Sequence, residues 1–129
     1  MICLLLTGCL CPFRCATDED LIDKLLKEWR AAIMTKNLDA LMCLYSDNYQ
    51  SAEHCDKEAL HKFLQNLFDH GQLNDAKVDL AAAKVEIRDC VADAAGIEVA
   101  ANFGDATVGF HLIKEGKAWK IDTMHTVLH

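Results

Sequence analysis

The chain has 129 residues, of which 52% are hydrophobic and only one is proline, a composition typical of a single domain with its own core. Its formal net charge is -7, and no run of basic residues is present that could neutralise phosphates, so the sequence argues against a nucleic-acid partner. It also lacks an apolar run of the roughly 20 residues that a membrane-spanning helix needs. Any attachment to a bilayer would therefore depend on the N-terminus.

The first 15 residues, MICLLLTGCLCPFRC, are interpreted as a leader that precedes one domain, residues 16–129. Leu6-Thr7-Gly8-Cys9 is similar to a bacterial lipobox, in which small residues admit a signal peptidase and the cysteine receives lipid. The residues before Cys9 include no Lys or Arg, and their apolar run is shorter than the ~7 to 15 residues of an ordinary signal core. We expect an exported protein anchored to a bacterial membrane through Cys9. The alternatives are a secreted or periplasmic soluble protein and a leader without function.

Seven cysteines are present, and they suggest neither a metal site nor a complete set of disulfides. The spacing in the leader is not the paired C-x-x-C of a structural zinc site, and we expect no metal or other cofactor. Removal of Cys3 and lipidation of Cys9 would leave Cys11, Cys15, Cys43, Cys55 and Cys90. Because this number is odd, at least one of them is expected to be free or to pair between chains. A Cys55–Cys90 bridge is compatible with an exported protein.

The region from residue 17 to residue 71 is predicted to hold three helices. Thr17 can accept hydrogen bonds from the first free amides of a helix, and the acids after it suit the positive end of the helix dipole. Asn37 can begin a short second helix in the same way, and the third runs from Asp56 to Gly71. Apolar residues at helical spacing predict one buried stripe in each helix: Ile22, Leu25, Leu26, Trp29 and Ile33; Leu38, Leu41, Met42, Leu44 and Tyr45; Leu60, Phe63, Leu64, Leu67 and Phe68.

From Ala76 onward, apolar residues alternate with polar ones, as in β-strands. The phase of this alternation changes near Ala82 to Lys84, which predicts a bulge there. Turns are expected at Asp93–Gly96, Gly104–Asp105 and Lys114–Gly116. Three helices followed by an antiparallel meander predict an α+β fold, with the helices covering one face of the sheet.

Three motifs, in this order, resemble those of the nuclear transport factor 2-like domains, also called SnoaL-like or ketosteroid isomerase-like. They are W-x-x-A-I followed by N-L-D-A-L-x-x-L-Y-S-D-N, then D-K-E-A-L-x-x-F-L, then G-K-A-W-K-I. The resemblance covers roughly Asp18 to Leu128. It implies a cone-shaped fold of the order α-α-β-α-β-β-β-β, in which helices pack on a curved antiparallel sheet. Because the family includes isomerases, cyclases, dehydratases and binding subunits, the resemblance leaves the function open.

Ketosteroid isomerase is the catalytic example that this resemblance suggests. Such enzymes combine a carboxylate base with an oxyanion hole made by a tyrosine and a protonated aspartate. Alignment without gaps brings Glu53 to the base position, Trp29 to the tyrosine position, and Val108 or Gly109 to the aspartate position. A positioned base contributes about 10²- to 10⁴-fold in rate, and each oxyanion donor about 10²- to 10³-fold. Because both donors are replaced, the resemblance favours a binding domain over an isomerase.

The candidate catalytic residues are Glu53 and His125. Glu53 would face the cavity if it continues the strand phase of Tyr49 and Ser51, where burial would raise the pKa of its carboxyl; alternatively it belongs to a solvated loop. His125 shares the phase of Trp119 and Ile121, which predicts an inward side chain that is either catalytic or simply a core histidine. His111 is out of phase with its apolar neighbours and should point to the convex side. The candidate ligand-binding residues are Trp29, Tyr49, Phe110 and Trp119.

Two functions are therefore expected from the sequence. The first is a non-catalytic domain that binds a small apolar or amphipathic molecule in the cone, or that forms a homodimer or docks a partner through its sheet. The alternative is a cofactor-independent acid–base enzyme, an isomerase, cyclase or dehydratase, with Glu53 as general base.

Overall fold

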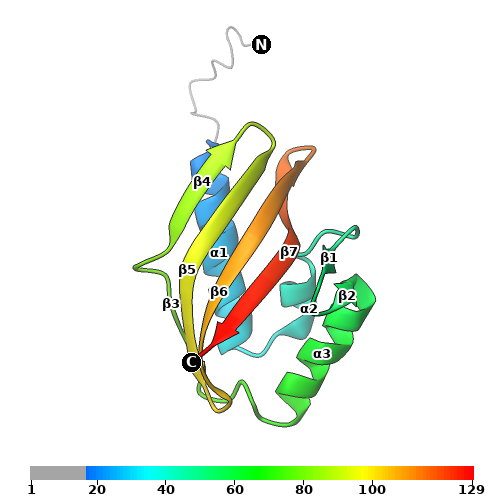
Figure 1. Ribbon diagram of the computed structural model, residues 1–129, viewed down its shortest axis with the longest axis vertical. Helices are drawn as coiled ribbons and strands as arrows, with labels where there is room; N and C mark the ends of the chain where they lie inside the picture. The colour runs from blue at the N-terminus through cyan, green and yellow to red at the C-terminus, as the bar shows by residue number, and fades with distance from the viewer. Residues whose placement is uncertain (1–16) are drawn as a thin grey trace, which may run out of the picture.

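The computed structural model describes residues 17–129, which form helices packed on an antiparallel sheet (Figure 1). The expected α+β class and the antiparallel sheet are confirmed. The elements, in chain order, are α1 (Asp18–Met34), α2 (Leu38–Met42), β1 (Gln50–Ser51), β2 (Cys55–Asp56), α3 (Lys57–Asp69), β3 (Lys77–Asp79), β4 (Lys84–Arg88), β5 (Val91–Ala101), β6 (Gly104–Glu115) and β7 (Ala118–Leu128).

Each helix begins at the polar residue that the sequence predicts. Thr17 and Asp20 form a capping box at the start of α1, in which each side chain accepts a hydrogen bond from the other residue's amide. Asn37 accepts from the amide of Ala40, and Asp56 accepts from the amide of Ala59. These side chains satisfy amides that have no partner within the helix, so they fix where α1, α2 and α3 begin.

The main sheet has the order β3-β5-β6-β7, and β4 pairs with another part of β5. The irregularity expected near residues 82–84 is an interruption rather than a bulge, because β3 ends at Asp79 and β4 begins at Lys84. The β5–β6 and β6–β7 hairpins turn close to the expected positions, at Asn102-Phe103 and at Gly116-Lys117.

The predicted turn at Asp93–Gly96 is wrong, because β5 continues through it. The β4–β5 hairpin turns earlier, between the paired residues Arg88 and Val91. Ala95-Gly96 instead forms a bulge in β5, which lies opposite β6. Gly96 has a φ of 81°, and a Cβ there would lie 2.8 Å from the carbonyl oxygen of Ala82. This position therefore requires glycine. Because glycine readily adopts a positive φ in turns as well as in bulges, Gly96 suggested a turn here.

A second bulge, in β7, changes which residues of that strand face the helices. His111 pairs with Thr123 but the next residue of β6, Leu112, pairs with Ile121, so Asp122 is the extra residue. One extra residue moves every later side chain to the opposite face of the sheet. Trp119 and Ile121 therefore face inward together with the even-numbered residues after the bulge.

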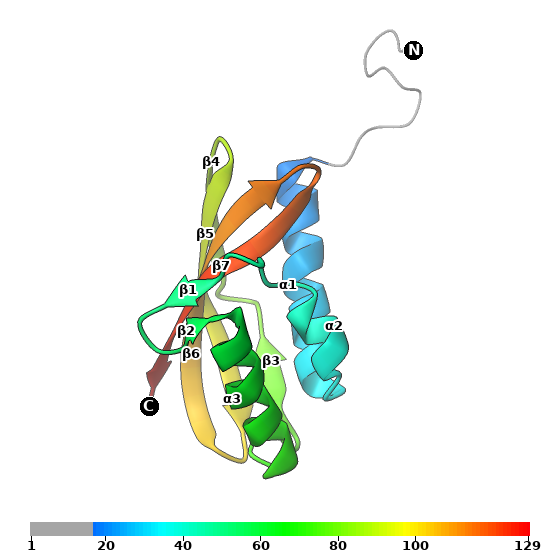
Figure 2. The same cartoon turned by 90° about the vertical axis from the view of Figure 1, so that its right-hand side faces the viewer.

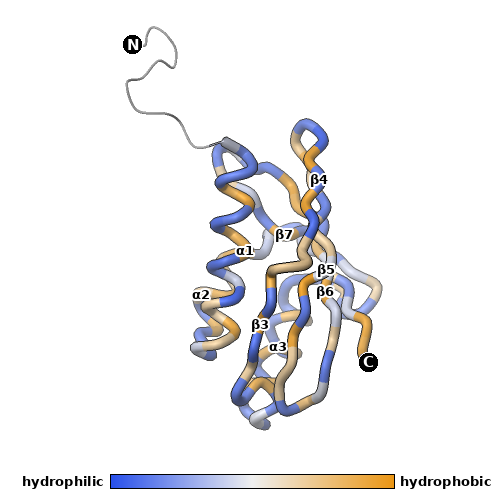
Figure 3. The backbone as a smooth tube through the Cα atoms, turned by 90° about the vertical axis from the view of Figure 1, so that its left-hand side faces the viewer, coloured by the Kyte–Doolittle hydropathy of each residue, from blue (hydrophilic) through white to orange (hydrophobic). Residues whose placement is uncertain are grey.

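The core lies between α1, α2 and the inner face of the sheet, the face that these helices cover (Figure 2). Hydrophobic and hydrophilic residues alternate along α1, as expected for an amphipathic helix (Figure 3). α3 lies at one end of the domain, and α1 begins at the other end. The largest fully buried side chains come from all of these layers: Tyr45, Tyr49, Phe110, Ile22, Leu41, Leu60, Ile97, Leu112 and Ile121.

Several expectations concern the N-terminal leader, and Cys9, Cys11 and Cys15 lie outside the described residues. Within residues 17–129, no helix is long and apolar enough to cross a membrane. Cys43, Cys55 and Cys90 are exposed free thiols, so the Cys55–Cys90 bridge that the sequence left open does not form.

Candidate functional site

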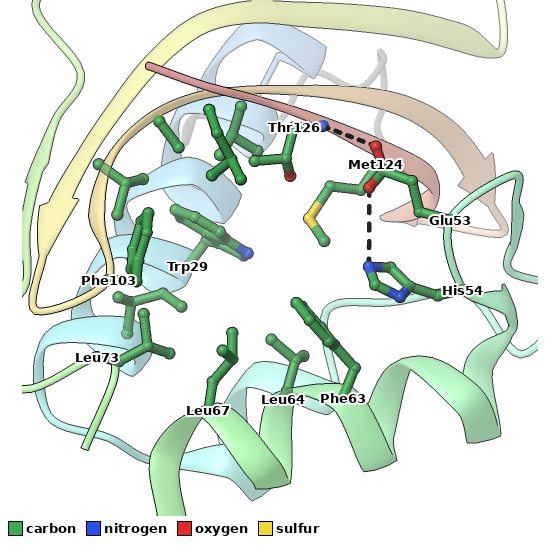
Figure 4. A pocket seen from close by; sticks show the side chains of 15 residues that line it. Trp29, Glu53, His54, Phe63, Leu64, Leu67, Leu73, Phe103, Met124 and Thr126 are labelled. Atoms are coloured by element: carbon green, nitrogen blue, oxygen red, sulfur yellow. Dashed lines mark hydrogen bonds and ion pairs between the residues drawn. The ribbon is translucent and has the colours of Figure 1, made fainter. Parts of the chain in front are cut away.

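An open pocket of about 450 Å³ lies between α1, α3 and the inner face of the sheet (Figure 4). This volume falls within the range of about 300–1,000 Å³ that is common for small-molecule sites. Most of the pocket is apolar, with walls from both helices, from three strands and from the turns near them: Trp29, Ile33, Phe63, Leu64, Leu67, Leu73, Val99, Phe103, Ala106, Val108, Met124 and Leu128.

Two polar residues, Glu53 and His54, form one end of this pocket, which we call the polar end. They lie in the turn between β1 and β2, and Figure 4 shows them across the cavity from Leu73 and Phe103. The hydroxyl of Ser51 accepts a 2.9 Å hydrogen bond from the His54 amide, which holds this turn in place. The pocket therefore has one polar end and an apolar remainder.

Glu53 also contacts the free edge of β7. Its Oε2 accepts a 3.4 Å hydrogen bond from the amide of Thr126, and its Oε1 lies 3.7 Å from Nε2 of His54. The first contact covers part of an edge strand, where unpaired amides would otherwise be open to solvent or to another chain. The Glu53 side chain remains 40% exposed, so its carboxylate stays partly hydrated.

His54 is more enclosed than Glu53, with a side chain that is 13% exposed. Its ring stacks on Phe63 of α3, with 4.2 Å between the ring centroids and 30° between the planes. This stacking fixes the imidazole against the apolar wall. Nε2 of His54 consequently faces Glu53.

Trp29 forms the wall on the α1 side. Its indole N–H donates a 3.0 Å hydrogen bond to the hydroxyl of Tyr45, and that hydroxyl donates to the sulfur of Met124 at 3.4 Å. The edge of one ring of the Trp29–Phe110 pair meets the face of the other, with centroids 5.1 Å apart. Burial raises the pKa of Tyr45 well above its ordinary value, although the bond from Trp29 opposes this shift. The indole N–H is therefore engaged in the core.

Of the residues predicted to form the site, Trp29 and Glu53 line the pocket. Tyr49, Phe110 and Trp119 are core residues outside its lining. Trp119 donates from its indole N–H to Asp18 at 3.1 Å, near the other end of α1. Alternation alone identified these aromatic residues as inward-facing but could not distinguish the pocket from the filled core.

Tyr49 is buried against Tyr45, and its hydroxyl forms no hydrogen bond with the described part of the chain. Ser51 and the backbone of Met124 are polar neighbours of this hydroxyl, but neither forms a geometrically acceptable hydrogen bond with it. Burial raises the pKa of Tyr49, and the carboxylate of Glu53 acts in the same direction.

The expected inward position of His125 is wrong. The extra residue Asp122 places Met124 and Thr126 on the inner face, whereas His125 is exposed on the outer face. There its ring lies over Gly109, where a Cβ would meet the imidazole Nε2 at 2.6 Å. Glu53 and His125 are thus not brought together. His111, as expected, points outward and pairs with Asp122 at 2.6 Å.

Most of the pocket residues were not recognised as site residues from the sequence, among them His54, Phe63, Met124 and Thr126. Phe63 belonged to the predicted buried stripe of α3 but is 39% exposed, because it borders an open pocket. Met124 and Thr126 required knowledge of the β7 bulge. Among residues 17–129, no cluster of three or more His, Cys, Asp or Glu is arranged to hold a metal ion.

No known family model matches this sequence, and no curated protein matches it either. Solved structures do match its fold. A protein of unknown function with a cystatin-like fold from Nostoc punctiforme is similar at a TM-score of 0.72 and 14% identity, over 88% of this chain and 93% of that one.

Two further structures are described as nuclear transport factor 2-like proteins of unknown function. The one from Pseudomonas putida has a TM-score of 0.70 and 15% identity, over 81% of this chain and 82% of that one. The one from Shewanella baltica has a TM-score of 0.67 and 17% identity, over 89% of this chain and 100% of that one. At these identities the similarity establishes the fold and not the function. The chain has the nuclear transport factor 2-like, or cystatin-like, fold.

Proposed function

We propose that this protein binds a small amphipathic molecule in the pocket between α1, α3 and the sheet. The observation that carries the proposal is the distribution of polarity within the pocket: Glu53 and His54 form one end, and nearly all other lining side chains are apolar. The apolar body of the molecule would lie against Trp29 and α3, and its polar group would lie at the polar end.

The exposure of apolar side chains around the pocket supports this proposal. Phe63 is 39% exposed and Leu128 is 71% exposed, and both line the pocket. Apolar surface left in contact with water disfavours the unliganded state by roughly 25 cal/mol for each Å² that a ligand could cover. Exposed apolar residues that line a concave site are typical of ligand binding.

The contacts of Trp29 favour binding over catalysis. Oxyanion stabilisation needs a donor aimed into the pocket, but the indole N–H of Trp29 is directed to Tyr45. The alternative, a cofactor-independent acid–base enzyme, is supported by the position of Glu53 in an apolar pocket. His125 cannot act as the second catalytic group of such an enzyme, because that residue lies on the outer face.

The charges on the outer face of the sheet disfavour the other expected function, a homodimer formed through that face. That face carries charged groups that already pair with one another, Arg88 with Asp93 and His111 with Asp122. Charged residues are depleted from the centres of stable protein interfaces.

The proposal can be tested by tryptophan fluorescence, because the chain has only two tryptophans. In W119F, emission comes from Trp29, which lines the pocket. Titration with decanol should shift the emission of Trp29 and saturate. W29F is the control, since the remaining Trp119 lies outside the lining and its emission should not shift. Unchanged Trp29 emission in folded W119F up to the solubility limit of decanol would reject the proposal.

A further inference from the structure

We propose that the polar group of the ligand is a protonated nitrogen, so that the natural ligand is a cationic amphiphile of the alkylamine class whose ammonium pairs with Glu53. This inference deepens the proposed function and rests on it. The charges and hydrogen bonds at the polar end carry it.

The charge of the pocket favours a cation over an anion. Among the described residues that line it, Glu53 is the only carboxylate, and none is a lysine or arginine. Lys57, which follows the β1–β2 hairpin, is held by the carboxylate of Asp47 and the carbonyl of Tyr45, both at 3.0 Å. An anionic group at the polar end would therefore meet one negative charge without a lysine or arginine to pair with, in a protein whose formal net charge is -7.

The carboxylate of Glu53 also has acceptor capacity to spare. An ionised carboxylate offers about four acceptor sites. Oε2 accepts one long hydrogen bond, from the Thr126 amide at 3.4 Å. Oε1 accepts none from residues 17–129, since His54 Nε2 lies 3.7 Å away. An ammonium group, with three donors and no acceptor, complements this arrangement.

The position of the carboxylate relative to the apolar walls selects an amphiphile rather than a small hydrophilic amine. Glu53 contacts β7 through Thr126, and the neighbouring inward residue of that strand, Met124, already belongs to the apolar wall. Phe63 continues that wall from below His54. An ammonium at Glu53 would consequently direct an attached chain along apolar side chains towards Phe103.

The test compares three probes with the same chain, decylamine, decanol and decanoate, on W119F at about pH 8, where carboxylates are ionised and imidazoles are neutral. We expect decylamine to bind about fivefold more tightly than decanol, as befits a partly exposed charge pair. Decanoate should bind most weakly. Added salt should reduce the preference for the amine, because it screens the pair.

The variant E53Q separates the charge of Glu53 from its structural contact. Glutamine keeps an oxygen that can accept from the Thr126 amide but removes the negative charge, so the ratio of decanol to decylamine dissociation constants should fall from about five towards one. E98Q is the matched control. Glu98 is exposed on the outer face and accepts from Thr107, so this variant removes one charge away from the pocket and should keep the ratio.

Three outcomes are distinguishable. Equal or tighter binding of decanol or decanoate to the protein with Glu53 intact would overturn the inference while leaving a binding pocket in place. An equal loss of decylamine affinity in E53Q and E98Q would also overturn it, since net charge rather than Glu53 would then attract the amine. Failure of all three probes to bind would reject the proposed function and this inference together.

Discussion

The indole N–H of Trp29 donates a 3.0 Å hydrogen bond to the hydroxyl of Tyr45, which links α1 to the segment that follows α2 inside the core. The same hydroxyl donates to the sulfur of Met124 on β7. These two hydrogen bonds join α1 and the segment after α2 to the sheet, directly behind the pocket. They fix Trp29 in the wall of the pocket while the polar atom of the indole is satisfied.

We expect Y45F to be less stable than the natural protein by about 1–3 kcal/mol, because it leaves the buried indole N–H of Trp29 without a partner. Y49F is the matched control: its hydroxyl is buried without a hydrogen bond to the described residues, so its removal should cost about nothing or stabilise the fold. Urea unfolding followed by far-UV circular dichroism measures both changes. A larger loss in Y49F than in Y45F would contradict the assigned hydrogen bonds.

Alkaline pH should unfold the protein through the same two residues, which are its only tyrosines. Burial raises the pKa of both Tyr45 and Tyr49 above the ordinary value of 10.0. The unfolded chain therefore loses these protons first, and the stability that the neutral hydroxyls confer is present below pH 10.0 and falls as the pH rises above it. Tyrosinate absorbance should appear together with loss of the circular dichroism signal. Ionisation near pH 10 in a protein that stays folded would disprove this expectation.

Acid pH should remove the contribution of Asp18 to the stability of the fold. This residue joins α1 to the β6–β7 hairpin. Its carboxylate accepts from Lys114 Nζ at 2.9 Å and from the indole of Trp119, and these bonds, with that of Lys114 the stronger influence, lower its pKa below 3.8. The unfolded chain takes up this proton first as the pH falls, so the contribution is present above pH 3.8 and is lost below it.

The variant D18N should accordingly be less stable than the natural protein at neutral pH, and the difference should vanish in acid. D23N is the control, because Asp23 forms only an exposed pair with Lys27 on the same helix. Urea midpoints measured across the acid range test this. A D18N deficit that persists in strong acid would contradict the assigned role of the carboxylate.

The expected lipid anchor can be tested without reference to the pocket. Expression of the full chain in a bacterium should place it in the membrane fraction with diacylglycerol on Cys9, detectable by mass spectrometry. C9A should lack the modification and leave that fraction. An unmodified Cys9 in soluble protein of full length would reject the anchor.

The sequence predicted the starts of the helices and the buried stripe of α1 well, because these are local features. Of the residues expected to be buried on α3, only Leu60 and Leu64 are. Thr17, Asn37 and Asp56 cap helices with their own neighbours, and the apolar spacing of α1 is visible without knowing what packs on it. The order of motifs then sufficed to predict the fold.

The site was less predictable because it depends on two irregularities and on distant segments. Asp122 adds one residue to β7 and reverses the facing of His125, and a strict alternation cannot reveal such an insertion. Gly96 marked a bulge where a turn was expected, since both can use a positive φ. Glu53 and Phe103, far apart in the chain, come to line the same pocket only in the folded protein.

The central claim is that the pocket binds an amphipathic molecule, and filling the pocket tests it most directly. Ala106 is a small residue in the wall contributed by β6, whereas Ala100 is exposed on β5. Calorimetric titration with decanol at several temperatures should give saturable binding with a negative heat-capacity change, the mark of apolar burial, for the natural protein and for A100F. A106F, verified as folded by circular dichroism, should not bind. Decanol affinity in folded A106F equal to that of the natural protein would contradict the claim.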